Sequence, residues 1–139
     1  MGYAINIGAR TGKKGRGRDV AHVELPDAPR FDGDERTGRS NSRHPSYSQW
    51  PEFARAVGLD LFFFHAERGT MRDHPGIVPL EPRHLRTVRK ALAEYKASNP
   101  DSVPGWGKRQ DPMLARMLWL EFWISWALKN CKFPALEHH

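Results

Sequence analysis

The sequence from Asp111 to Cys131 constrains the fold most, because it reads as one long helix that is apolar over most of its surface. It contains three of the five tryptophans of the chain, Trp119, Trp123 and Trp126. Asp111 is a good N-cap, and the proline after it occupies the first helical position, where its missing N–H costs nothing. Since a surface helix needs only one apolar face, we expect this helix to be packed on several sides or to form part of a subunit interface.

Polar side chains form only a narrow stripe on this helix. With about 100° of rotation per residue, the polar side chains that fall on one line along its surface are Glu121, Ser125, Lys129 and Lys132. The two lysines lie at the far end of the helix, where positive charge suits the helix dipole. Arg116 lies instead on the side of Trp123, so its guanidinium is expected either to reach water past an indole or to pair with an acid in the interior. The apolar run is short and carries charges, whereas a membrane crossing needs about 20 apolar residues, so we predict no membrane span.

The length of 139 residues fits one domain with one core. Residues 136–139 (LEHH) resemble the start of a purification tag, so we assign the domain to residues 1–135 and set the last four residues aside. The single cysteine, Cys131, excludes an internal disulfide and fits a reducing compartment. No signal peptide is recognisable, because the basic residues follow the first apolar run instead of preceding it. We therefore expect a cytoplasmic protein.

Hydrophobic periodicity predicts the other elements. Helices are expected from about Ser48 to Val57 and from residue 82 to about residue 97, each with an apolar stripe at helical spacing. Strands are expected at Tyr3–Gly8, at Val20–Leu25 and, as a buried apolar run, at Leu59–His65.

The segments at residues 26–45 and 66–80 lack any period and are rich in turn-forming residues, so they are expected to be loops. The sum is about three strands and three helices. We predict an α+β domain in which a small, mainly antiparallel sheet packs against the helices, with a long buried C-terminal helix.

Basic residues are concentrated in two segments. The formal net charge is +6, but residues 9–18 hold five basic residues and no acid, and residues 82–97 hold five basic residues and one acid. Local positive charge favours an anionic partner such as nucleic acid, although a solvated loop and the outer face of a surface helix show the same pattern. The candidate polyanion-binding side chains are Arg10, Lys13, Lys14, Arg16, Arg18, Arg83, Arg86 and Lys90.

No cofactor motif has the required spacing. Gly8 to Lys14 resembles a phosphate-binding P-loop, but it has three residues between its glycines instead of four and lacks the hydroxyl residue after the lysine. Asp32 begins like a calcium loop, but Arg36 and Thr37 stand where a ligand and a glycine are needed. We therefore predict neither a cofactor nor a metal.

Three functions stay open on the sequence alone. The preferred one is a non-catalytic interaction or assembly module that uses Trp119, Trp123 and Trp126 to bind a second copy or a protein partner. The second is a binder of nucleic acid or another polyanion. The third is a metal-dependent enzyme around His65, Glu67 and His74, since His65 and Glu67 would share one side of an extended segment. These three residues are interpreted as ordinary loop residues, so an enzyme is the less favoured class.

Overall fold

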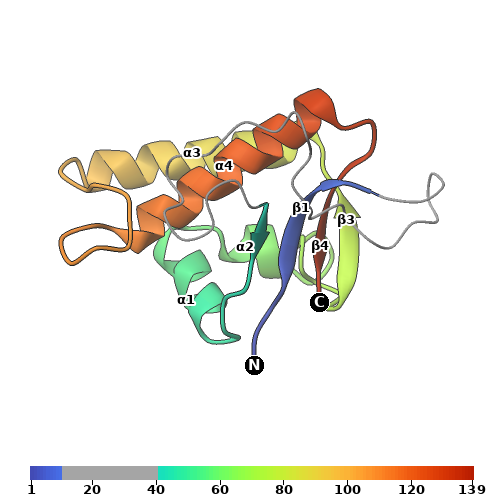
Figure 1. Cartoon of the computed structure of the whole chain (residues 1–139), viewed down its shortest axis with the longest axis horizontal. Helices are drawn as coiled ribbons and strands as arrows, with labels where there is room; N and C mark the ends of the chain where they lie inside the picture. Colours follow the sequence, from blue (N-terminus) through green and yellow to red (C-terminus); the bar gives the residue numbers. More distant parts are fainter. Residues whose placement is uncertain (11–40) are drawn as a thin grey trace.

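The structure, a computed structural model, describes residues 1–10 and 41–139, and these form a four-stranded sheet with four helices (Figure 1). The helices are α1 (Gln49–Ala56), α2 (Asp60–Phe64), α3 (Pro82–Ser98) and α4 (Pro112–Asn130). The strands are β1 (Ile5–Ala9), β2 (Ser42–Arg43), β3 (Gly76–Pro79) and β4 (Pro134–His138). The predicted α+β class and antiparallel sheet are confirmed, with one more strand and one more helix than expected.

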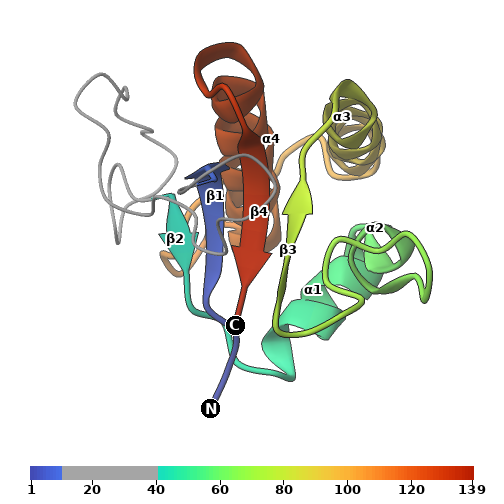
Figure 2. The same ribbon diagram turned by 90° about the vertical axis from the view of Figure 1, so that its right-hand side faces the viewer.

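The sheet has the order β2-β1-β4-β3, and each neighbouring pair is antiparallel. Its two central strands, β1 and β4, come from opposite ends of the chain (Figure 2) and pair from Ile5 opposite His138 to Ala9 opposite Pro134. Strand alternation directs the fully buried Ile5 and Ile7 to the same face. Helix α4 packs against β1 and β4 and so covers this apolar face.

Three of the four C-terminal residues that resemble a purification tag in sequence, residues 136–138, lie in β4, in the centre of this sheet. Leu136 pairs with Ile7 in β1 and is fully buried, and His138 is buried opposite Ile5. The folded unit therefore continues past residue 135, through β4 to His138.

Helix α4 is covered by the sheet on one side and by α3 along another (Figures 1 and 2). Its N-cap is as predicted, with the Asp111 carboxylate accepting hydrogen bonds from the backbone N–H groups of Met113 and Leu114. Trp119 and Trp123 are 0% and 1% exposed, whereas Trp126 is only half-buried. A single chain thus already hides most of the apolar surface of α4. Among the helices that the structure describes, none is both long and apolar enough to cross a bilayer.

The sequence predictions were wrong in three segments. The segment Leu59–His65 contains the short helix α2 and not a strand, because a short apolar run fits either element by periodicity. Part of the loop expected at residues 66–80 forms the edge strand β3, and the end of the segment 26–45 contributes β2 at the other edge. The strand expected at Val20–Leu25 lies outside the described residues.

Candidate functional site

Helices α3 and α4 lie side by side and antiparallel (Figure 1). Arg89 of α3 forms an ion pair with Glu121 of α4 at 3.8 Å, and further along α3 the Tyr95 hydroxyl donates a hydrogen bond to Asp111. Residue numbers thus rise along α3 while they fall along α4. The first turns of α3 therefore lie at the same end of the molecule as the last turns of α4.

The end of β1 lies at the same end of the molecule as the first turns of α3 and the last turns of α4. The backbone N–H of Arg10 donates to the carbonyl of Phe133 at 2.8 Å, and the N–H of Leu80 donates to the carbonyl of Pro134 at 2.9 Å. The start of α3, the end of β1 and the turn between α4 and β4 therefore meet. We call this region, together with the outer face of α3 as far as its middle at Lys90, the cationic end. Its basic side chains are Arg10, Arg83, Arg86, Arg89, Lys90, Lys129 and Lys132.

Four of these cations have no acidic partner among the residues that the structure describes. They are exposed and form no ion pair there: Arg86, Lys90, Lys129 and Lys132. Arg83, in contrast, is held at 2.6 Å by Glu81, whose pKa is lowered by the hydrogen bond from that guanidinium. Arg86 and Lys90 are one helical turn apart, about 6 Å along the axis, so the helix presents both charges on its outer face.

The structure brings together part of the set predicted from sequence. Arg10 and the α3 residues Arg83, Arg86 and Lys90 share the cationic end, whereas residues 13–18, with the other four predicted cations, lie outside the described part of the chain. Sequence reasoning missed Lys129 and Lys132 as site residues, since their position at the end of a helix was explained by the helix dipole. Only the antiparallel pairing of α3 with α4 links them to the first turns of α3.

A hollow of about 350 Å³ opens on the outer side of α4 beside the cationic end. Its lining residues are Arg89, Glu121, Phe122, Ser125, Trp126 and Lys129. Lys129 belongs both to this hollow and to the cationic end. The hollow therefore combines two half-buried aromatic rings with basic side chains at its rim.

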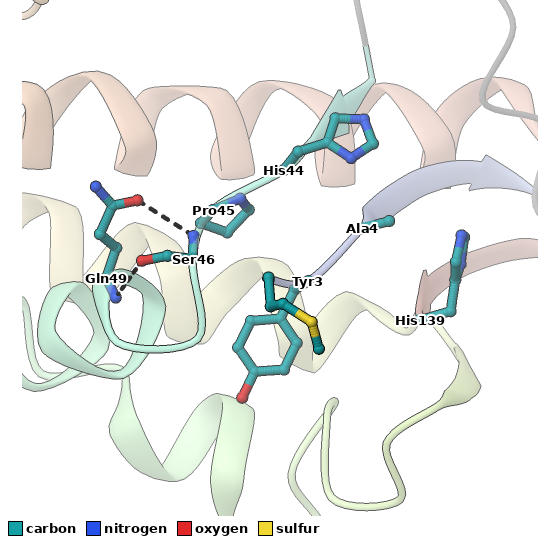
Figure 3. Close-up of a pocket in the computed structure, with 9 residues that line it drawn as sticks. Tyr3, Ala4, His44, Pro45, Ser46, Gln49 and His139 are labelled. Atoms are coloured by element: carbon teal, nitrogen blue, oxygen red, sulfur yellow. Dashed lines mark hydrogen bonds between the residues drawn. The ribbon is translucent and has the colours of Figure 1, made fainter.

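A larger hollow, of about 590 Å³, lies near the N-terminus (Figure 3). His44 and His139 line it from different segments, but the polar groups of Ser46 and Gln49 are used in capping α1. The Gln49 side chain accepts from the Ser46 N–H at 3.2 Å, and the Ser46 hydroxyl accepts from the Gln49 N–H at 3.1 Å. This hollow is wide and open, and the side chains of Ser46 and Gln49 are committed to the start of α1, so we assign it no chemistry.

The two histidines of the enzyme hypothesis have separate structural roles, and Glu67 contributes only its backbone N–H to the first of them. His65 Nδ1 accepts the backbone N–H groups of Glu67 and Arg68, each at 3.1 Å, and so closes the turn after α2. His74 instead stacks on His138, with 2.8 Å between their Nδ1 atoms. Within residues 1–10 and 41–139, no three His, Cys, Asp or Glu side chains are grouped closely enough to hold a metal ion.

Comparison with known proteins gives no relative for this chain, since no family model, curated protein or solved structure matches it.

Proposed function

We propose that the protein is a non-catalytic binding module whose partner is a polyanion, in the first place nucleic acid, bound at the cationic end. The observation that carries the proposal is a group of four exposed cations without acidic partners in the described chain. Arg86 and Lys90 lie on the outer face of α3, Lys129 lies in the last turn of α4, and Lys132 lies in the turn after it. Cationic side chains that neutralise phosphates release condensed counterions, and this release drives binding.

The positions of these charges favour a site over a merely basic surface. Arg86 and Lys90 are carried by a 17-residue helix that packs on α4, and Lys129 lies in the last turn of that second helix. Cations held on packed helices keep their spacing when a ligand binds, so less conformational entropy is lost than with charges on a flexible loop.

Titration of a fluorescently labelled oligonucleotide, followed by anisotropy, tests this proposal. Four phosphate contacts predict that log K falls with log salt with a slope of about −3 for a single strand. Binding should therefore weaken strongly between about 50 mM and about 200 mM salt. Absence of binding at the lower salt concentration would refute the proposal, and competition with inorganic polyphosphate tells nucleic acid from polyanions in general.

Assembly through α4 is the second candidate, because Phe122 and Trp126 are only half-buried on its outer side. Stable interfaces bury about 1,200 to 2,000 Å² in total. With Trp119 and Trp123 already buried inside one chain, less of α4 is left for a second copy or a protein partner. Sedimentation velocity at two protein concentrations tests this candidate, and a concentration-dependent shift to a dimer would favour it.

A further inference from the structure

We infer that the hollow on the outer side of α4 holds one unpaired nucleobase, so that the partner of the cationic end is single-stranded nucleic acid. This inference rests on the proposed function and adds to it the class of nucleic acid. It starts from the composition of the hollow, in which the half-buried rings of Phe122 and Trp126 lie beside the basic side chains of Arg89 and Lys129.

The aromatic rings are held in place by the core. Trp123 is fully buried, and it contacts Trp126 at a centroid distance of 5.5 Å and Phe122 at 5.2 Å, in both cases edge to face. Edge-to-face contacts of this kind stabilise ring positions beyond the burial of area alone. Trp126 is therefore a prearranged surface on which a base can stack.

The basic side chains at the rim of the hollow favour an anionic ligand. Arg89 is paired with Glu121 across the α3–α4 boundary, which leaves Lys129 as the rim cation without an acidic partner in the described chain. Lys129 is also part of the cationic end, so a strand whose phosphates contact that end passes directly over the hollow. Single-strand binders combine a basic track for the backbone with aromatic side chains for the bases, and this surface has both parts.

The size of the hollow favours one base over a base pair. Pockets for drug-sized ligands range from about 300 to 1,000 Å³, so a volume of about 350 Å³ lies at the lower limit. In a duplex the bases are stacked on one another and present only their edges in the grooves, so a face-on aromatic contact requires a base that is free.

Affinity measurements on matched variants test the inference. Wild-type protein should bind a single strand of about 12 nucleotides more tightly than the duplex of the same sequence at equal salt. Trp126→Leu should weaken single-strand binding by about five- to a hundredfold, the loss of one stacked base, with an unchanged salt slope. Trp126→Phe, which keeps a ring, should recover most of the affinity, and Leu118→Ala, a truncation on the same helix outside the hollow, should have little effect.

Photocrosslinking of wild-type protein keeps the test independent of how the variants fold. An oligonucleotide with 5-iodouracil should form its adduct on the peptide that contains Trp126. Adducts only elsewhere, equal affinity for single strand and duplex, or a Trp126→Leu variant that binds like wild type would overturn the stacking site while leaving the proposed function standing. Failure to bind any oligonucleotide at low salt would instead refute the proposed function itself.

Discussion

The hydroxyl of Tyr95 on α3 donates a hydrogen bond to the carboxylate of Asp111, and the same carboxylate caps the first turn of α4. Burial raises the pKa of Asp111, but the hydrogen bonds from Tyr95 and from the backbone outweigh this effect and hold the pKa below its usual value. Burial and the bond to Asp111 together raise the pKa of Tyr95 to about 12. One carboxylate thus joins the end of α3 to the start of α4 and helps to fix their antiparallel packing.

Removal of this carboxylate should destabilise the domain. Asp111→Ala loses an N-cap, which costs about 1 kcal/mol, and also the acceptor of the Tyr95 hydroxyl, for a total of about 2 kcal/mol in the free energy of unfolding. Tyr95→Phe alone should cost about 1 kcal/mol, and the double variant should cost less than the sum because the shared bond is lost once. Urea unfolding measures all three values, and strictly additive losses would show that the bond contributes nothing.

Acid should destabilise the domain through His138. Burial, and next the neighbouring His74, lower the pKa of His138 from 6.5 to about 4. A folded-state pKa below the unfolded value means that the stability is fully present above about pH 6.5 and is lost as the pH falls towards about 4, by up to about 3 kcal/mol. Urea unfolding between about pH 7 and about pH 4.5 measures this slope. The His138→Gln variant should have a clearly shallower slope, although the buried His84, whose pKa is also lowered by burial, still contributes to it. Equal profiles for the two proteins would contradict the prediction.

Arg116 and Trp106 should be energetically coupled. The guanidinium lies over the Trp106 ring at 4.8 Å from its centroid, and Arg116 forms no ion pair with the residues that the structure describes. Neither sequence-based alternative is met in full, because the guanidinium itself packs on an indole instead of reaching water, and that indole belongs to the loop before α4. A double-mutant cycle with Arg116→Ala and Trp106→Ala should give a coupling of about 1 kcal/mol. A coupling close to zero would mean that the contact adds no stability.

Elements with a local signal were predictable from sequence. The bounds of α4 follow from Asp111 and the proline after it, and α3 follows from its apolar stripe. The strand β2 has no such signal, because Ser42 and Arg43 form a strand only through their pairing with β1. β4 is hidden in the sequence for a different reason, since its last residues, 136–138, resemble the start of a purification tag.

Residues of the candidate site, too, were predictable from sequence only where they carry a local signal. Arg86 and Lys90 were found because they share a helix face, but Lys129 joined them only when the structure showed how α3 and α4 pair. Periodicity also could not separate Trp126 from the buried Trp119 and Trp123, since it marks a residue as apolar without telling which neighbour covers it. Tertiary packing decides both points.

The position of the cationic end, and not net charge, should determine binding. The variant Arg86→Glu with Lys90→Glu reverses two charges there, whereas Lys108→Glu with Arg109→Glu reverses two exposed charges in the α3–α4 loop at the opposite end of the molecule. The two variants have the same net charge, which makes the second a matched control. Both should retain the wild-type circular dichroism spectrum, since all four side chains are exposed.

The most direct test of a binding site at the cationic end is the salt-dependent affinity of the two variants for one labelled oligonucleotide. Reversal at the cationic end should lower the affinity by about tenfold or more and make the salt slope shallower by about 1.4, the share of two phosphate contacts. The control should stay within about twofold of wild type. An equal loss in both variants would show that binding follows overall charge and would contradict a site at the cationic end.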